Sequence, residues 1–225
     1  MIETLTARIA SGALAPGAML ASEPDLARDF GVSPGTVRKA LGALEGRGLV
    51  TRQQGRGTFV TVRTPESALF HFFRLHGLDG VRSDPVLERE HVTARTARPA
   101  ETAALFDAPA RVVEIVRVRS VAGTRALYER AVVPAALFPG LAERAPLPNT
   151  LYALYQRAYS CAIVRAEDSL HAGGATPEVA AALDLTEGAP VLISERRAVD
   201  LLERVVELRT SHYRTDALRY RVDLT

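Results

Sequence analysis

Apolar side chains recur every three or four positions in three short stretches at the start of the chain, with polar residues between them. Residues spaced in this way share one face of an α-helix, so the pattern predicts three short amphipathic helices. Their apolar positions are Leu5, Ile9 and Ala13; Leu26 and Phe30; and Val37, Ala40, Leu41 and Leu44.

Capping residues mark the starts of the second and third helices. Ser22 precedes Glu23, and Ser33 precedes Pro34. A serine hydroxyl satisfies the free N–H groups of a helix start, an acid suits the positive end of the helix dipole, and proline is tolerated at the first helical position. Two short helices joined by a tight turn at Gly31 predict a helix-turn-helix.

After the third helix, the segment "LVTRQQGRGTFVT" alternates polar and apolar residues around two glycines. This predicts a β-hairpin with Gln54-Gly55-Arg56-Gly57 at its tip, in the position of a wing. On the third helix, Arg38 can donate two hydrogen bonds to guanine, Thr36 can bond a base edge or a phosphate, and Gly35 leaves the helix start open to a phosphate. An isolated arginine is more often simply solvated, but caps, apolar stripe, turn and basic wing together favour DNA binding.

The rest of the chain mixes strand and helix patterns without the regular alternation of a parallel sheet. Long hairpins are predicted over residues 111–133, turning at Ala122-Gly123-Thr124, and over residues 191–216. Further strands are predicted at 86–95, 161–172 and 219–224, and helices at 101–106, 150–159 and 176–185. The prediction is an α+β fold: a winged helix-turn-helix followed by an antiparallel sheet with helices on one side.

The predicted organisation has a winged helix-turn-helix over residues 1–62, a linker over residues 63–83 and a second domain over residues 84–225. The net charge of +2 lies in the first part, which has seven basic and five acidic side chains, while the remainder is balanced. Five of the seven basic residues fall between positions 38 and 56. Their position, more than the small excess, indicates a nucleic-acid surface.

Composition excludes several classes of protein. No apolar run reaches the roughly 18 to 20 residues of a membrane span, and the N-terminus lacks a signal-peptide pattern, so we expect a cytoplasmic protein with no membrane partner. Cys161 is the only cysteine, which excludes an internal disulfide, and its apolar neighbours indicate a buried thiol. His71 and His76 are not spaced as a metal-binding pair on one helix face. We therefore predict no metal and no cofactor.

Polar side chains gather on one face of the predicted sheet. Strand alternation places Arg117 and Arg119 on one face of the first hairpin, with Glu129 on the returning strand. A second group shares a face of the second hairpin: Glu207, Arg209, Ser211 and Tyr213. Arginines suit a carboxylate or phosphate, so the pattern fits a site for a small anionic ligand. It fits equally well a set of cross-strand ion pairs on a solvated face.

The segments "SGALAPGAMLASEPDLARDFGVS", "GTVRKALGALEGRGLV" and "RQQGRGTFV" resemble the winged helix-turn-helix head of GntR-family bacterial transcription regulators, over nearly all of residues 8–60. By this resemblance, eight residues fall on family DNA-contact or wing positions: Ser22, Glu23, Thr36, Arg38, Gly55, Arg56, Gly57 and Thr58. Four more complete the predicted DNA-binding set: Ser33, Gly35, Lys39 and Arg52. Pro34 stands where the family commonly has a DNA-contacting arginine, so one usual contact is absent and the operator sequence can differ.

The segments "VLEREHVTARTARPA", "VVEIVRVRSVAGTRALYERAVVPAALFPGL", "GAPVLISERRAVD" and "VVELRTSHYRTD" resemble the UTRA effector-binding domain of the HutC subfamily of GntR regulators. Their spacing resembles that of the family's ligand-contacting residues, with Thr150 at a hydroxyl position. The resemblance implies an effector site made of Arg117, Arg119, Glu129, Thr150, Glu207, Ser211 and Tyr213. The family binds varied small molecules, so the identity of the effector does not transfer.

The resemblance implies a homodimeric transcription regulator. We expect a repressor that leaves an inverted-repeat DNA operator when a small anionic metabolite binds, and we expect no enzymatic activity. Two other classes stay open. The second domain also resembles the chorismate-lyase fold, so the chain could be an enzyme with a DNA-binding head. An all-helical, metal-dependent effector domain, as in other GntR subfamilies, is disfavoured by the strand content and the scattered histidines.

Overall fold

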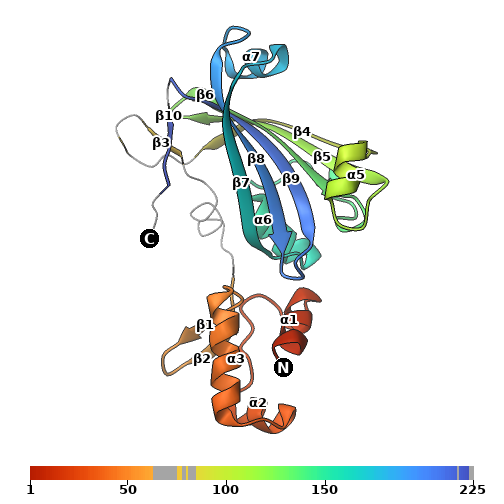
Figure 1. Cartoon of the computed structure of the whole chain (residues 1–225), viewed down its shortest axis with the longest axis vertical. Coiled ribbons are helices and arrows are strands. Elements are labelled where there is room, and N and C mark those ends of the chain that lie inside the picture. Colours follow the sequence, from red (N-terminus) through yellow and green to blue (C-terminus); the bar gives the residue numbers. More distant parts are fainter. Residues whose placement is uncertain (63–74, 78–79, 81–84, 217, 223–225) are drawn as a thin grey trace.

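The structure is a computed structural model that describes residues 1–62, 75–77, 80, 85–216 and 218–222. A small helical head contains the N-terminus, and a larger domain is built on a twisted sheet (Figure 1). The elements of the head are α1 (Ile2–Ala10), α2 (Glu23–Phe30), α3 (Pro34–Gly46), β1 (Val50–Gln53) and β2 (Gly57–Val60). Its three helices and its antiparallel β1–β2 wing confirm the predicted winged helix-turn-helix.

The apolar stripes of the three helices form the core of the head. Each of five core side chains is no more than 3% exposed: Leu5, Leu26, Val37, Leu41 and Leu44. The α3 residues among them are spaced i, i+4 and i+7, which places them on one side of the helix and leaves its other side to solvent.

Six antiparallel strands form the sheet of the larger domain, in the order β4-β5-β6-β9-β8-β7. Their bounds are β4 (Val86–Thr96), β5 (Arg111–Val121), β6 (Thr124–Pro134), β7 (Ile163–Gly174), β8 (Pro190–Asp200) and β9 (Val205–Arg214). Both predicted long hairpins, β5–β6 and β8–β9, are confirmed. The first turns through Ala122 and Gly123, which both have positive φ, as a two-residue hairpin turn that follows the strand twist requires.

The helices of this domain lie on both faces of the sheet, so the expectation of helices on one side is wrong. The helices are α5 (Pro99–Ala104), the short 3-10 helix η1 (Ala142–Arg144), α6 (Leu151–Tyr159) and α7 (Pro177–Leu183). On one face, here called the inner face, α6 packs against Val113 and Ile115 of β5. On the outer face, α7 packs against Val118 of β5 and Tyr128 of β6. Because neighbouring strand residues point to opposite faces, strands that are apolar at both sets of positions require a cover on each side.

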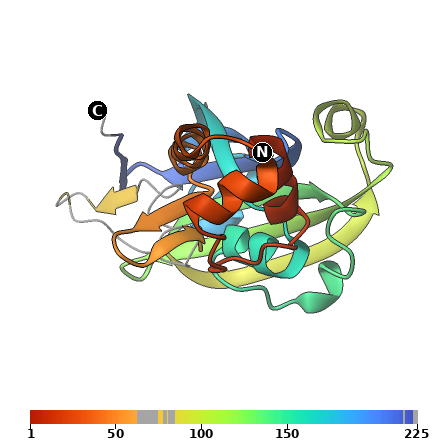
Figure 2. The same ribbon diagram turned by 90° about the horizontal axis from the view of Figure 1, so that it is seen from below.

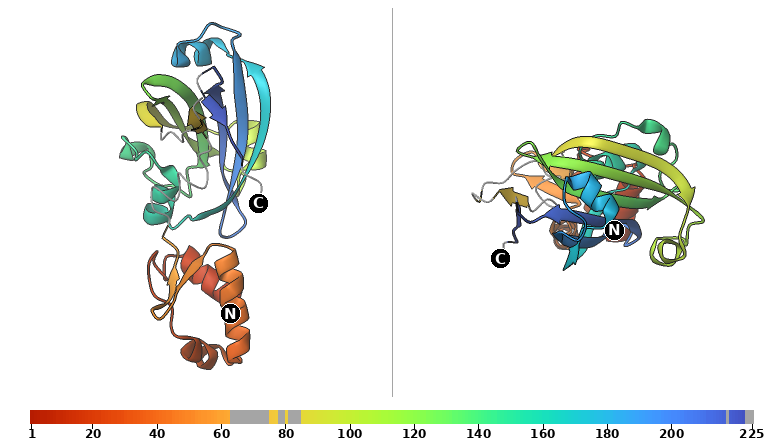
Figure 3. Two further views of the ribbon diagram at one scale, coloured as in Figure 1. Left: turned by 90° about the vertical axis from the view of Figure 1, so that its left-hand side faces the viewer. Right: turned by 90° about the horizontal axis from the view of Figure 1, so that it is seen from above.

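The predicted linker, residues 63–83, lies largely outside the described residues, as does His71. Within that range, β3 (Leu75–Gly77) pairs antiparallel with β10 (Leu218–Tyr220). The strand predicted at 219–224 is therefore shorter, and its last two positions lie outside the described residues. The head lies at the end of the sheet near α6 (Figures 2 and 3).

Candidate functional site

The exposed side of α3 is the first candidate surface. Ser33 Oγ accepts a hydrogen bond from Thr36 N at 3.2 Å and caps the helix, as the sequence predicts. The residues predicted to contact DNA from this helix start are all exposed: Ser33, Gly35, Thr36, Arg38 and Lys39. A helix whose polar side is presented in this way can enter the major groove of DNA.

Two of the predicted DNA-contacting arginines have partners within the head itself. Arg38 Nε lies 3.0 Å from Glu23 Oε2, although the Arg38 side chain is 67% exposed. A surface ion pair contributes at most about 1 kcal/mol, so Arg38 can exchange Glu23 for a base edge. Arg52 Nη2 donates to Arg38 O at 2.9 Å and so ties the wing to α3. At the start of α2, Ser22 Oγ accepts from Asp25 N at 3.3 Å.

The wing presents Arg56 at its tip. Gly55 and Gly57 have φ of 71° and 117°, in the region that favours glycine, and the tight turn between β1 and β2 depends on them. Arg56 is exposed and has no ion-pair partner in the part of the chain that the structure describes. Leu20 N donates to Thr58 O at 2.8 Å, which fixes the second wing strand to the chain before α2. The wing therefore presents an exposed cation beside the helix-turn-helix.

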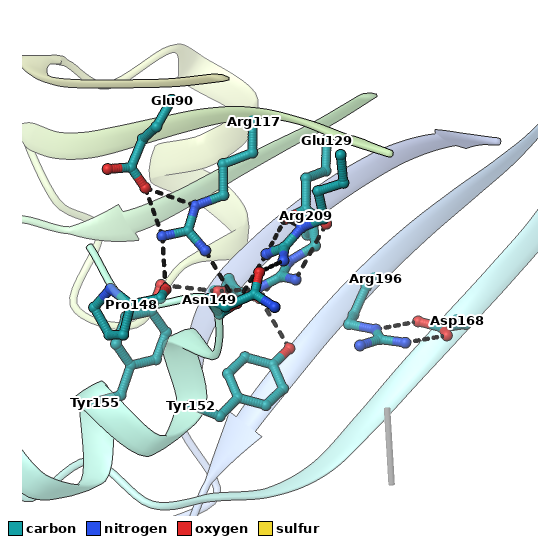
Figure 4. Close-up of polar contacts among 12 residues, drawn as sticks. Glu90, Arg117, Glu129, Pro148, Asn149, Tyr152, Tyr155, Asp168, Arg196 and Arg209 are labelled. Atoms are coloured by element: carbon teal, nitrogen blue, oxygen red, sulfur yellow. Dashed lines mark hydrogen bonds and ion pairs between the residues drawn. The ribbon is translucent and has the colours of Figure 1, made fainter. Parts of the chain in front are cut away.

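The second candidate site is a group of charged side chains on the inner face of the sheet, here called the polar cluster (Figure 4). It contains Arg117, Arg119, Arg209, Glu90, Glu129 and Glu207, whose side chains are at most 10% exposed. Burying an unpaired charge costs several kcal/mol, so each of these groups needs a partner. Three guanidiniums and three carboxylates provide those partners within the cluster.

Arg117 joins the sheet to the loop before α6. Its Nε donates to Glu90 Oε2 at 2.8 Å, and two further nitrogens donate to the carbonyl oxygens of Pro148 and Asn149. The other oxygen of Glu90 accepts from Leu147 N at 2.8 Å. Burial lowers the pKa of Arg117, and the nearby charge of Arg119 lowers it further. All three nitrogens of the Arg117 guanidinium thus donate hydrogen bonds within the protein.

Arg119 on β5 binds Glu129 on β6 diagonally, since the residue directly opposite Glu129 is Arg117. Arg119 Nε donates to Glu129 Oε1 at 3.0 Å, and its other nitrogens donate to the side chain and the carbonyl oxygen of Asn149. Burial alone would raise the pKa of Glu129, but the positive charges of Arg119, Arg209 and Arg117 lower it to about 2. Glu129 is therefore ionised at neutral pH.

Glu207 is held from two elements at once. Arg209 Nε and Nη2 donate to its two carboxylate oxygens at 3.0 and 2.9 Å. From α6, the hydroxyls of Tyr152 and Tyr155 donate to the same two oxygens at 2.9 and 3.0 Å. Burial and the charge of Glu207 raise the pKa of both tyrosines, which keeps these hydroxyls protonated as donors.

The structure brings most of the predicted effector residues together. All seven are buried: Arg117, Arg119, Glu129, Thr150, Glu207, Ser211 and Tyr213. Ser211 faces Glu129 across β6 and β9, and Thr150 directly precedes α6. Tyr213 lies further along β9, where its ring contacts Tyr220 with centroids 5.8 Å apart. The arginines do form cross-strand ion pairs, as the alternative interpretation expected, but in the interior rather than on a solvated face.

Several residues of this region were missed by the sequence reasoning. Tyr152 and Tyr155 are spaced i, i+3 in a predicted helix, which is the only signal that could have placed them on one side. Asn149 lies in a loop and gave no signal. Arg196 and Asp168, on β8 and β7, form a further pair with two contacts of 2.6 Å (Figure 4). Only the strand order shows that this pair lies on the same face as the polar cluster.

A groove of about 710 Å³ lies on the outer face, between α5 and α7, and contains none of the seven predicted effector residues. Its central charges are paired with each other, since Arg130 Nη2 lies 3.0 Å from Glu178 Oε1. The charged groups of the polar cluster, by contrast, converge from four strands, β4, β5, β6 and β9. Among the described residues, no three His, Cys, Asp or Glu side chains are grouped to hold a metal, and no helix is long and apolar enough to cross a membrane.

Comparisons with known proteins identify a family for each of the two parts of the chain. Residues 1–60 match the description "Bacterial regulatory proteins, gntR family", and residues 83–219 match "UTRA domain". The HTH-type transcriptional regulator SmoD of Agrobacterium fabrum is 30% identical over 92% of this chain and 82% of its own. The HTH-type transcriptional repressor NagR of Bacillus subtilis is 32% identical over 87% of this chain and 81% of its own.

A solved structure supports the fold over the whole chain. PhnF from Mycobacterium smegmatis superposes with a TM-score of 0.57 at 25% identity and covers 100% of this chain and 99% of its own. The predicted fold class and family are confirmed. The chain belongs to the GntR family of bacterial transcription regulators and combines a helix-turn-helix DNA-binding head with a UTRA effector-binding domain.

Proposed function

We propose that the protein is a homodimeric repressor in the bacterial cytoplasm, and that a small anionic metabolite bound at the polar cluster releases it from an inverted-repeat operator. The observation that carries this proposal is the set of buried arginines held in pairs by Glu90, Glu129 and Glu207. The relative named as a repressor, NagR, supports the sign of regulation.

The charge balance of the polar cluster explains how an anion could act as a signal. Because every guanidinium of the polar cluster already has a carboxylate partner, an incoming carboxylate or phosphate would compete with one of these glutamates for an arginine. The displaced glutamate then loses hydrogen bonds and moves. A ligand shifts a conformational equilibrium only by its difference in affinity for the two states, typically about 1 to 3 kcal/mol of coupling.

The head supports the DNA-binding part of the proposal. Arg38 would leave Glu23 and read a guanine in the major groove, while Arg56 on the wing would contact phosphates. Two copies related by a two-fold axis would place two such helices on the two halves of an inverted repeat. Bacterial operators lie in the cytoplasm, which accounts for the proposed location.

An enzymatic role for the UTRA domain is less well supported. A general base works best when its pKa is near the working pH, and the pKa of Glu129 is lowered to about 2 by three arginines. Incubation of the protein with a bound effector, followed by mass spectrometry of the small molecule, would distinguish an enzyme from a sensor. Recovery of an unchanged effector is expected for a sensor, and a converted product would support an enzyme.

Selection of bound sequences from a random double-stranded DNA pool, at two salt concentrations, tests the proposal. We expect enrichment of an inverted repeat with a fixed distance between its halves. Enrichment of a single, unrepeated site would contradict the homodimer on DNA. The enriched sequence then serves as the probe in a screen of anionic metabolites, where loss of binding identifies the effector and increased binding would contradict the expected release.

A further inference from the structure

Two of the elements through which the UTRA domain contacts the head are α6 and the turn of the β8–β9 hairpin. On α6, Gln156 Nε2 donates to the carbonyl oxygen of Thr61 at 3.2 Å. Thr61 belongs to the head, since its own N–H donates to Leu49 O at 2.9 Å. At the end of α6 the two parts approach closely, because a Cβ on Gly12 would lie 2.8 Å from Ser160 Oγ.

The second element is the turn of the β8–β9 hairpin. Leu201, at this turn, is 8% exposed and belongs to the apolar core of the head together with Leu5 and Leu41. The turn is internally braced, because the Asp200 carboxylate accepts hydrogen bonds from the backbone and the guanidinium of Arg204. A braced turn transmits a displacement of its strands instead of absorbing it.

Both elements meet at one carboxylate inside the UTRA domain. Glu207 is on β9, in the same hairpin as Leu201, and accepts hydrogen bonds from Tyr152 and Tyr155 of α6. Tyr155 precedes Gln156 directly, and Tyr152 is one helical turn away, about 6 Å along the axis. One turn of α6 therefore binds Glu207 through its two tyrosines and binds the head through Gln156. Glu207 itself is 0% exposed, and its hydrogen bonds in the described part of the chain are with Tyr152, Tyr155 and Arg209.

We propose that Glu207 is a positioning residue through which effector binding reaches the DNA-binding head. In the effector-free protein, Glu207 holds α6 and the β8–β9 hairpin in the positions that dock the head. An anion that takes Arg209 from Glu207 frees this carboxylate, shifts α6 and loosens the contacts at Thr61 and Leu201. This inference rests on the proposed function, because it names the route by which the effector site controls the head.

The test compares two carboxylates of the UTRA domain by hydrogen exchange of the full chain, without DNA or effector. Glu207→Gln keeps the volume but removes the charge that holds Arg209. Glu114→Gln is the matched control, since Glu114 is also held by an arginine but lies on the outer face, outside the polar cluster, where its ion pairs are with Arg95, Arg98 and Arg130. We expect Glu207→Gln to speed exchange in head peptides around Gly12 and Thr61 about tenfold or more, and Glu114→Gln to leave them unchanged. Equal effects of the two variants, or no effect of Glu207→Gln on the head, would overturn the proposal.

A second pair of variants tests the docking contact and does not disturb the polar cluster. Leu201 is buried in the head, whereas its neighbour Leu202 is 45% exposed. Leu201→Ala is expected to speed exchange of the head peptides, and Leu202→Ala to leave them as in the parent protein; the same response to both would overturn the docking role. If an operator is selected but Glu207→Gln does not speed hydrogen exchange in the head peptides, the role proposed for Glu207 is overturned and the proposed function is not. Failure to select an operator overturns the proposed function, whatever the exchange shows.

Discussion

At the scale of single residues, arginine serves two purposes in this protein. Arg38 is an exposed arginine in a weak surface pair, whereas Arg119 is 2% exposed and bound to Glu129 and Asn149. The first can change partners at little cost, which suits base recognition. The second cannot lose its partner without leaving a buried charge, which couples its binding role to stability.

Arg38→Ala is expected to reduce discrimination at one base position in each half-site by roughly 1 to 3 kcal/mol. The physical reason is the loss of a two-bond contact to guanine. Competition binding with operators mutated at single positions measures the effect. Lys39→Ala, one residue along the same helix, serves as the control for a general loss of charge. Unchanged base preference in Arg38→Ala would remove Arg38 from the recognition surface.

Arg119→Met is expected to destabilise the fold by about 3 to 5 kcal/mol, because it leaves Glu129 buried without its main partner. The double variant Arg119→Met, Glu129→Met should recover most of that loss. Urea unfolding of both variants measures the two free energies. Similar losses in the single and the double variant would show that Arg119 contributes through packing and not through its charge.

At the scale of elements, the wing and α3 divide the work on DNA. The cap at Ser33 and the apolar stripe fix α3 on the head, while the glycines of the wing fix the place of Arg56. Contacts to base edges carry sequence information, and contacts to phosphates carry affinity that depends on salt. The two elements should therefore respond differently to mutation.

Arg56→Ala is expected to weaken binding to all DNA sequences alike and to lower the slope of log K against log salt by about one unit. Binding titrations at several salt concentrations give the slope directly. Gln54→Ala, on the same turn, removes no charge and should keep the slope of the parent protein. A slope in Arg56→Ala equal to that of the parent would exclude a phosphate contact by the wing.

At the scale of the whole molecule, the polar cluster links stability to pH. The pKa of Glu129 is about 2 in the folded protein, below the value of about 4.3 expected in the unfolded chain. A carboxyl group with a lowered folded pKa stabilises the fold above its unfolded pKa, and this contribution disappears as the pH falls toward the folded pKa. The difference corresponds to a contribution on the order of 3 kcal/mol at neutral pH.

We therefore expect the free energy of unfolding to fall between about pH 4.5 and pH 2, and Glu129→Gln to show a smaller fall over that range. Urea unfolding at a series of pH values compares the two proteins. Arg119 and Arg209 remain in the variant, so its absolute stability is also expected to be lower at neutral pH. Parallel pH curves for the two proteins would show that Glu129 does not contribute to acid unfolding.

The sequence by itself determined the head and the strand pairs. Helix periodicity, serine caps and glycine turns act over a few residues, so α2, α3, the wing and both long hairpins could be predicted from local pattern alone. Strand alternation also placed Arg117 and Arg119 on one face, because that alternation is a property of the extended backbone.

Only the tertiary structure decided what covers each face of the sheet and what each charge binds. The strands β5 and β6 are buried on both sides, and this follows from the positions of α6 and α7, which local pattern does not encode. The tyrosine partners of Glu207 come from positions 52 and 55 residues away and meet it only when α6 packs on the sheet. Hydrogen bonds between distant segments depend on the packing of whole elements, whereas periodicity records only which residues are neighbours on one element.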